Sequence, residues 1–161
     1  WQCGTLQVDL NMPERLGGNY VSNDGAKKNP VMLHRALFGS LERFTGILLE
    51  HYAGKLPAWL APVQAIIAPI TSELNEYADE INEQLKNNGV RVQTDLRNEK
   101  ISYKIREHSV AKVPIIFAIG ERETRDRTVN IRRLGSKNTQ IIVLGEAIKL
   151  IQNEATPPDR R

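Results

Sequence analysis

The stretch Pro114-Ile115-Ile116-Phe117-Ala118-Ile119-Gly120 decides the fold class of this 161-residue chain. Its interior is apolar throughout, without the alternating polar residues that mark a strand with one face in water. A short apolar run that ends at glycine is typical of a central strand covered on both faces. The pattern therefore predicts an α/β architecture, in which helices pack against a sheet.

Apolar runs alternate with helical patterns on both sides of this strand. Four further strands are expected at residues 63–67, 90–96, 128–133 and 139–143. Helices are expected from Ser72 to a stop at Asn88-Gly89, over residues 99–110 and over residues 146–154. The first of these helices carries one apolar stripe, made of Leu74, Tyr77, Ala78, Ile81 and Leu85. This part of the chain predicts a mixed five-stranded sheet flanked by helices.

The beginning of the chain is organised differently. Within residues 1–10, polar and apolar side chains alternate, as in a strand with one polar face. Residues 40–52 have apolar residues at helical spacing, and Ser40 is a suitable N-cap. Residues 54–62 contain two prolines and a glycine, which is typical of a linker. We therefore predict two domains: residues 1–56 and residues 57–161.

The composition excludes several classes of protein. With 40% hydrophobic and 25% charged residues, the chain has the composition of a globular protein and not of a disordered tail. No apolar run approaches the ~20 residues that a membrane helix needs, so we expect no membrane partner. The single cysteine excludes a disulfide scaffold and a metal site built only from cysteines, and it favours a reducing compartment.

The net charge of +3 is too small by itself to indicate nucleic-acid binding, but the charges are unevenly distributed. Residues 71–90 contain five acidic residues and one basic residue, whereas residues 91–137 contain twelve basic and six acidic residues. A basic zone attracts phosphate groups. The same charges can equally form an ordinary solvated surface, so the pattern alone leaves both interpretations open.

The chemistry-bearing segment is residues 34–43, an apolar strand that runs through a Gly-Ser turn into a helix. Small residues at such a junction let a ligand approach the backbone, and a helix N-terminus favours an anion. Arg43 follows Ser40 by about one helical turn, so its guanidinium can return to the same opening and donate to a polyphosphate. On these features alone, Arg43 fits either an anion site or a surface charge.

The stretch Gly39-Ser40-Leu41-Glu42-Arg43, between its strand and its helix, resembles motif 3 of the class II aminoacyl-tRNA synthetases. The opening Trp1-Gln2-Cys3-Gly4-Thr5-Leu6-Gln7-Val8-Asp9 and the stretch Pro30-Val31-Met32-Leu33-His34-Arg35-Ala36 narrow this resemblance to the threonyl-tRNA synthetases. Asp95-Leu96-Arg97-Asn98-Glu99-Lys100-Ile101, continued by Lys104-Ile105-Arg106-Glu107-His108, resembles their C-terminal anticodon-binding domain. The resemblance covers essentially the whole chain, in order.

The resemblance implies that residues 1–56 are a fragment of an antiparallel class II catalytic domain and that residues 57–161 are an anticodon-binding domain. Because the chain opens without methionine, we expect it to be the end of a larger enzyme. The implied activity of that enzyme is that of a threonine–tRNA ligase. It joins threonine to ATP as threonyl-adenylate and pyrophosphate, and then transfers threonine to tRNA-Thr.

Individual roles follow from the same resemblance. Arg43 matches the catalytic motif 3 arginine, which binds the ATP phosphates and stabilises charge on pyrophosphate. The positions implied to line the threonine and ATP site, with Mg²⁺ accompanying ATP, are Gln2, Thr5, Gln7, Ala36, Ser40 and Arg43. His34 matches one of three ligands of a zinc ion (Zn²⁺), although a histidine in an apolar run is by itself more often a core residue. The other two ligands fall outside this chain, so we expect the fragment alone neither to bind zinc specifically nor to catalyse adenylation.

The residues that match anticodon-contacting positions of the family are Asn98, Arg106, Glu123 and Arg132. Such side chains read unstacked loop bases through hydrogen bonds to the base edges. Basic residues expected to attract the RNA backbone are Lys100, Lys104, Arg122, Arg125 and Arg127. Any of these residues can instead be a surface charge or a helix-cap partner.

For the intact enzyme we expect a homodimer in the cytoplasm, with an organellar form left open. The alternative interpretation is a stand-alone or regulatory RNA-binding protein derived from a class II synthetase. The two interpretations differ in what lies upstream of this sequence.

Overall fold

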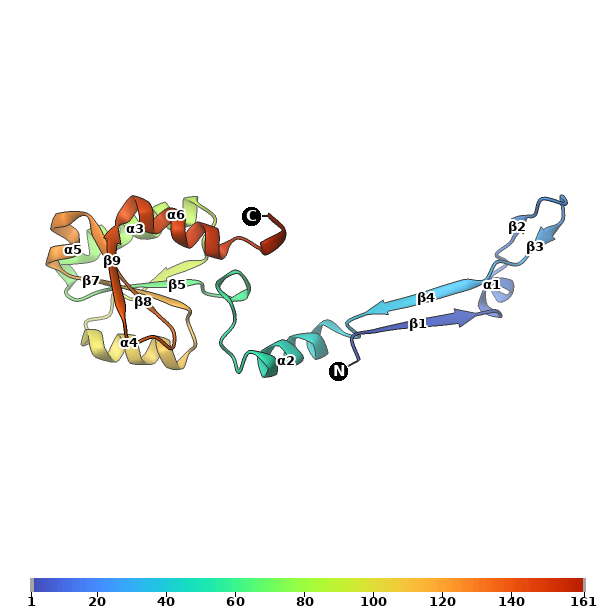
Figure 1. Ribbon diagram of the computed structural model, residues 1–161, viewed down its shortest axis with the longest axis horizontal. Helices are drawn as coiled ribbons and strands as arrows, with labels where there is room; N and C mark the ends of the chain where they lie inside the picture. Colours follow the sequence, from blue (N-terminus) through green and yellow to red (C-terminus); the bar gives the residue numbers. More distant parts are fainter. Residues whose placement is uncertain (1, 161) are drawn as a thin grey trace. The chain divides into compact units, whose positions relative to one another are not determined.

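The computed structural model describes residues 2–160, so Trp1 of the predicted first strand lies outside the described residues (Figure 1). The chain divides into two compact units, the first ending at Glu50 and the second beginning at His51. The predicted division before residue 57 falls inside the second unit, just before the turn η1 (Ala58–Leu60). As a domain boundary, it stays a prediction. No helix among residues 2–160 is long and apolar enough to cross a lipid bilayer.

The first unit is built on two antiparallel strands, β1 (Gly4–Asp9) and β4 (Met32–Leu37). Their register runs from Gly4 opposite Leu37 to Asp9 opposite Met32. Between them lie the helix α1 (Met12–Arg15) and the paired two-residue strands β2 (Tyr20–Val21) and β3 (Lys27–Lys28). The helix α2 (Leu41–His51) follows β4, close to its predicted limits.

The second unit contains the predicted mixed five-stranded sheet, which is confirmed. Its strands are β5 (Ala65–Pro69), β6 (Val92–Thr94), β7 (Ile115–Ile119), β8 (Thr128–Arg133) and β9 (Thr139–Val143). They lie in the order β6-β5-β7-β8-β9, and β5 is parallel to both of its neighbours. The pairs β7–β8 and β8–β9 are antiparallel. The apolar stretch that decides the fold class is thus the middle strand.

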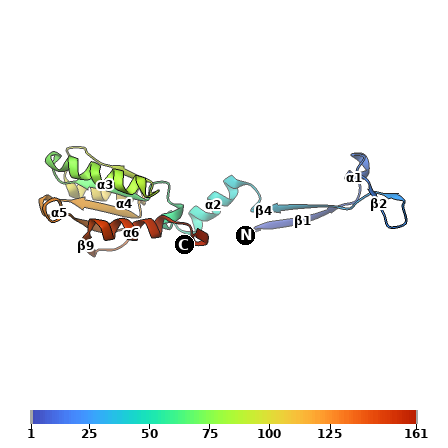
Figure 2. The ribbon, with the colours of Figure 1, turned by 90° about the horizontal axis from the view of Figure 1, so that it is seen from above.

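Helices cover this sheet on two faces. They are α3 (Asn75–Asn87), preceded by the turn η2 (Ser72–Leu74), α4 (Ile101–Val110), α5 (Glu121–Asp126) and α6 (Leu144–Ala155), followed by the turn η3 (Pro158–Arg160). The helices α3 and α6 lie side by side over one face, and α4 covers the other (Figure 1 and Figure 2). The predicted apolar stripe of α3 is buried against Ile115 and Phe117 in a shared core. Burial of such a stripe supplies most of the stability of a helix this short.

The order of the strands creates a crevice at one end of the sheet. The chain passes from β5 through α3 to β6 on one side of β5, and then through α4 to β7 on the other side. Its winding therefore reverses between β5 and β7. In open α/β sheets, ligands bind outside the carboxyl ends of the strands at such a switch point.

The six-residue helix α5 was absent from the sequence-based prediction, since five of its residues are charged and have no apolar period. A local polar contact forms it instead. The Glu123 carboxylate accepts a hydrogen bond from the Gly120 N–H at 2.9 Å, which caps the first turn. Arg127 ends the helix in a left-handed conformation, at φ 53°.

Buried polar groups hold the segment that leads into the sheet. Gln64 is fully buried, and its Nε2 donates to the carbonyl oxygens of Ala58 at 3.0 Å and Ala155 at 3.3 Å. The guanidinium of Arg91 donates two hydrogen bonds to the carbonyl oxygen of Ala61. The predicted linker is therefore fixed to the second unit from Ala58 onward.

Candidate functional sites

The polar face of the β1–β4 pair brings predicted site residues of the first unit together. The register places Thr5 opposite Ala36 and Gln7 opposite His34, and residues opposite each other in a ladder point to the same face. A hollow of about 150 Å³ lies at one end of the pair and is lined by Gln2, Gly4, Thr5, Ala36, Gly39 and Arg43. A second hollow, of about 570 Å³, is lined in part by Gln7 and His34.

The turn between β4 and α2 places Arg43 at the first of these hollows. Phe38 and Gly39 both have positive φ angles, 63° and 69°, so the chain reverses sharply there. Ser40 caps the helix as predicted, because its Oγ accepts a hydrogen bond from the Arg43 N–H at 3.1 Å. Gly39 is suited to this turn because a side chain would be strained at that φ angle. The backbone position of Arg43 is therefore fixed by the capped first turn of α2.

The described residues do not by themselves form a zinc site. Among residues 2–160, no three His, Cys, Asp or Glu side chains lie close enough together to hold a metal ion. A zinc site needs at least three protein ligands, and His34 is an exposed residue opposite Gln7. His34 as a zinc ligand stays a prediction that concerns a longer chain.

The second unit places Arg106 and Arg132 in one hollow, of about 620 Å³, between α4 and β8. Arg132 pairs with Ile116 in the register of the sheet, on the face that α4 covers. The walls of the hollow are mainly apolar, and the lining residues are Ile101, Ser102, Ile105, Arg106, Ser109, Val110, Lys112 and Arg132. Two guanidinium groups beside an aliphatic wall can bind a flat, polar-edged group such as a nucleobase.

Glu123 lies in a different hollow, at the switch point between the carboxyl ends of β5 and β7. This hollow, of about 330 Å³, is lined by Ile70, Thr71, Leu74, Gly120, Glu121, Arg122 and Glu123. A Cβ atom at Gly120 would lie 2.8 Å from Oε2 of Glu123 and 3.2 Å from Cδ1 of Ile70. Glycine is therefore required for the capping contact. The half-buried Glu123 carboxylate still has lone pairs that can accept further hydrogen bonds.

Asn98 is exposed in the loop that follows β6, and it lines neither of these two hollows. Its neighbour Arg97 fixes the loop, because its guanidinium donates to both carboxylate oxygens of Asp95, at 2.8 and 2.7 Å. The same guanidinium also binds Glu107 of α4. The structure thus brings Arg106 and Arg132 together, and places Glu123 and Asn98 separately at the carboxyl ends of the parallel strands.

The prediction that Lys104 attracts the RNA backbone is wrong. Its side chain is only 2% exposed, and its ammonium donates to the carbonyl oxygens of Pro69 at 3.0 Å and Asp95 at 2.9 Å. A group enclosed in this way cannot reach a phosphate. Sequence reasoning missed this role because nothing in the helical pattern around Lys104 distinguishes it from an exposed lysine.

The remaining basic residues are exposed, but two of them are already paired. Arg125 forms an ion pair with Asp126, and Arg127 forms one with Glu80 of α3. Arg127 also lies over the ring of Tyr77, 4.8 Å from its centroid. The hydrogen bond from Arg127 lowers the pKa of Glu80 below its ordinary value. Lys100 and Arg122 are exposed at the carboxyl edge of the sheet, where they can attract phosphate groups.

Two family models match the chain. Residues 1–52 match the tRNA synthetase class II core domain (G, H, P, S and T), and residues 64–154 match the anticodon binding domain. The chain belongs to the anticodon-binding domain family of the class II aminoacyl-tRNA synthetases and carries a segment of their core domain.

Its similarity to individual proteins defines the type of synthetase. The chain is 59% identical to a threonine–tRNA ligase of Parvibaculum lavamentivorans over 161 residues, which are 100% of this chain and 25% of the relative. It is 59% identical to that of Paramagnetospirillum magneticum over 158 residues, 98% of this chain and 25% of the relative. The chain therefore corresponds to a segment of threonyl-tRNA synthetases that comprises part of the class II core and the anticodon-binding domain, and it spans about a quarter of the length of these curated relatives.

Solved structures agree with this assignment. The RNA binding domain of threonyl-tRNA synthetase from Cryptosporidium parvum Iowa II superposes with a TM-score of 0.85 and is 35% identical, covering 98% of this chain and 40% of that chain. A prolyl-tRNA synthetase of Cryptosporidium parvum shares the fold, with a TM-score of 0.70 at 24% identity, over 96% of this chain and 36% of that chain.

Proposed function

We propose that this chain is the anticodon-reading part of a threonine–tRNA ligase, together with one wall of its threonine and ATP site. The hollow between α4 and β8 carries the proposal, because it joins Arg106 and Arg132 to an aliphatic wall. Exposed bases of an anticodon loop need a flat apolar surface and hydrogen-bond donors aimed at their edges. This hollow offers both.

Base reading in this proposal is divided among the predicted residues. Arg106 and Arg132 donate to acceptor atoms on the edge of a base, for which the forked guanidinium is well suited. Glu123 accepts from an amino or imino group, as a guanine edge presents. Asn98 can both donate and accept from its exposed loop. Lys100 and Arg122 attract the RNA backbone without reading sequence.

In the first unit, the proposed role is to bind ATP and threonine within the intact enzyme. Arg43, in the first turn of α2, would bind phosphate oxygens of ATP, whose other charges Mg²⁺ neutralises in solution. Gln2, Thr5 and Ala36 line the same hollow, and Ser40 caps the helix beneath it. Gln7 and His34 face the adjoining hollow. We propose that the intact enzyme is a cytoplasmic homodimer that supplies the zinc ligands missing from these residues.

The experiment that tests this function measures binding of two anticodon stem-loop RNAs to the 161-residue chain. One RNA carries a threonine anticodon, and the other has one anticodon base changed. We expect tighter binding of the first, and we expect Arg132→Ala to reduce the difference by ~1–3 kcal/mol. Asn98→Ala should reduce it as well.

Fluorescence anisotropy at a fixed salt concentration gives both dissociation constants. Lys149→Ala, an exposed change on α6, is a control that should leave the difference unchanged. Equal affinity of the unaltered chain for the two RNAs would contradict the proposed reading function.

A further inference from the structure

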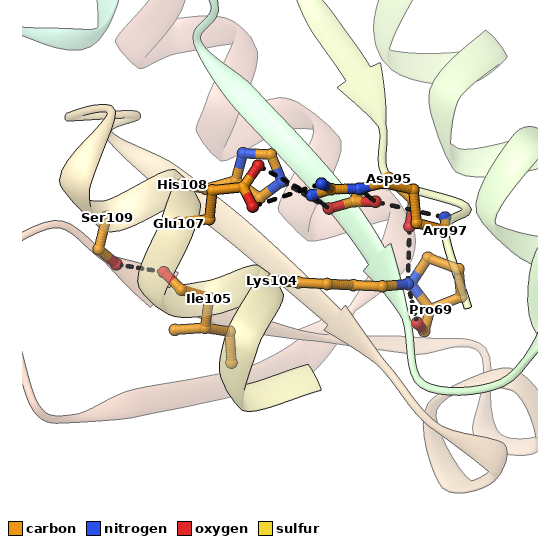
Figure 3. Close-up of polar contacts among 8 residues, drawn as sticks. All are labelled: Pro69, Asp95, Arg97, Lys104, Ile105, Glu107, His108 and Ser109. Atoms are coloured by element: carbon orange, nitrogen blue, oxygen red, sulfur yellow. Dashed lines mark hydrogen bonds and ion pairs between the residues drawn. The ribbon is translucent and has the colours of Figure 1, made fainter. Parts of the chain in front are cut away.

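The ammonium of Lys104 lies where two strands of the sheet separate. The β5–β6 ladder extends to Ile67 opposite Thr94, and the Asp95 N–H still donates to the Ile67 carbonyl oxygen at 2.8 Å. Beyond this point, the carbonyl oxygens of Pro69 and Asp95 both accept from Lys104 (Figure 3). Buried carbonyl groups need hydrogen-bond partners. One side chain of α4 therefore joins the ends of both strands at the base of the loop that bears Asn98.

The Asp95 carboxylate makes a second connection between that loop and α4. It accepts two hydrogen bonds from the Arg97 guanidinium, and its Oδ2 lies 2.8 Å from Nε2 of His108. Arg97 in turn binds Glu107, with Nη2 3.0 Å from Oε1 (Figure 3). The loop is thus attached to α4 at Lys104, Glu107 and His108, which lie on successive turns of one helix face.

The opposite side of α4 lines the hollow between α4 and β8 that contains Arg106 and Arg132. Ser102, Ile105, Arg106 and Ser109 face that hollow, whereas Lys104, Glu107 and His108 face the loop. A small rotation of α4 about its axis would move Arg106, and it would also break the contacts of the other face. The position of Arg106 and the position of the Asn98 loop are therefore mechanically linked through one helix.

We propose that Lys104 is a positioning residue for anticodon discrimination: by joining β5, β6 and α4, it holds Asn98 and Arg106 at a fixed separation without touching RNA itself. This inference rests on the proposed function. Asp95, Arg97, Glu107 and His108 complete the same network. Hydrogen bonds to base edges tolerate little displacement, so a loosened network affects base reading more than attraction to the RNA backbone.

The test compares Lys104→Met, which keeps the length of the side chain and removes the ammonium, with the unaltered 161-residue chain. For the folded protein, the ratio of the two stem-loop affinities should fall about tenfold. The affinity for the RNA with the changed base, and the slope of affinity against salt concentration, should stay the same. Lys86→Met, on the exposed side of α3, is the matched control and should leave the ratio unchanged.

Other outcomes separate positioning from stability. A purely structural role would lower the affinities for both RNAs by the same factor, equal to the loss of folded protein. An unchanged ratio of the two affinities in folded Lys104→Met overturns the proposal. If circular dichroism shows that Lys104→Met does not fold, Glu107→Gln at the partly exposed end of the network decides. It should lower the ratio about threefold without weakening binding of the changed RNA, since it removes a negative charge.

The matched control for that variant is Glu83→Gln on the exposed side of α3. An unchanged ratio in Glu107→Gln overturns the proposal. No discrimination by the unaltered chain would instead overturn the proposed function itself, so the two failures are distinguishable.

Discussion

The strand β4 of the first unit and the strand β7 of the second both carry large apolar residues, yet these residues meet opposite environments. Ile115, Phe117 and Ile119 of β7 are at most 1% exposed, because α3 and α6 cover that face. Leu33 and Leu37 of β4 are 62% and 57% exposed. Among residues 2–50, only Pro13 is buried. Apolar residues in a strand therefore favour burial, but the neighbouring elements of the fold determine whether those residues are buried.

This contrast assigns different sources of stability to the two units. The second unit buries a continuous core, which is the main favourable contribution to folding. The first is built mainly on the β1–β4 ladder and on α2, a helix without buried residues. Two-stranded ladders are at best marginally stable in water. Substitutions in the two units should therefore differ strongly in effect.

The largest expected difference is between Phe117→Ala and Leu6→Ala. Removal of the buried Phe117 ring should lower the free energy of unfolding by ~3–5 kcal/mol, through lost burial and the cavity left behind. Leu6 is 61% exposed, so its removal should change stability by less than ~0.5 kcal/mol. Urea unfolding followed by circular dichroism measures both. A large loss for Leu6→Ala would mean that β1 is covered in solution.

A smaller effect is expected from Asp95→Asn in the second unit. The Arg97 guanidinium, more than any other group, holds the pKa of the Asp95 carboxyl well below its usual 3.8. Its stabilising contribution is therefore complete above about pH 4 and is lost as the pH falls through the lowered pKa of the folded state. Asp95→Asn should cost ~3 kcal/mol at pH 7, because Arg97 and His108 lose a buried partner.

The pH dependence of unfolding provides the control for this prediction. As the pH is lowered from 7 to 3, the difference in unfolding free energy between the unaltered chain and Asp95→Asn should narrow. The exposed Asp79→Asn on α3 should show no such trend. A constant difference across this range would show that the Asp95 charge contributes nothing to folding.

The smallest effects are expected from two glycine-to-alanine changes of opposite sign. Gly120→Ala brings a Cβ to 2.8 Å from Glu123, and overpacking of this kind should cost ~1–2 kcal/mol. Gly46 lies in the interior of α2 with no neighbour within 4 Å of an added Cβ, so Gly46→Ala should favour the helix by ~0.5–1 kcal/mol. Helical content and thermal unfolding distinguish the two. A loss of helix in Gly46→Ala would contradict the open surroundings of α2.

Much of the second unit could be predicted from periodicity, because its core residues lie at regular spacing in the sequence. The stripe from Tyr77 to Leu85 and the strand β7 are both buried as expected. The helix α5 escaped prediction because a capping bond to Glu123, and not an apolar stripe, determines it. Lys104 was misplaced because its partners, Pro69 and Asp95, are 35 and 9 residues away.

The candidate sites were predictable to a different extent. Alternation assigns Gln7 to a polar face, but only the register of β1 against β4 places it opposite His34. Arg106 lies on a helix and Arg132 on a strand. Sequence periodicity predicts each of these elements but does not indicate that they lie side by side. Their shared hollow depends on the packing of α4 against the sheet. Residue roles could therefore be matched to a family, whereas proximity required the folded chain.

The buried amide of Gln64 has a consequence for the architecture of the second unit. It binds Ala58, which precedes the first strand of the sheet, and Ala155, the last residue of α6. The two ends of the part of this unit that holds the sheet and its helices therefore lie side by side, as in domains that tolerate circular permutation and insertion into other proteins. A short peptide joining residue 156 to residue 57, with new ends opened at the exposed turn 135–138, should preserve the fold. The sheet and its helices are thus suited to insertion into another protein through one pair of neighbouring connections.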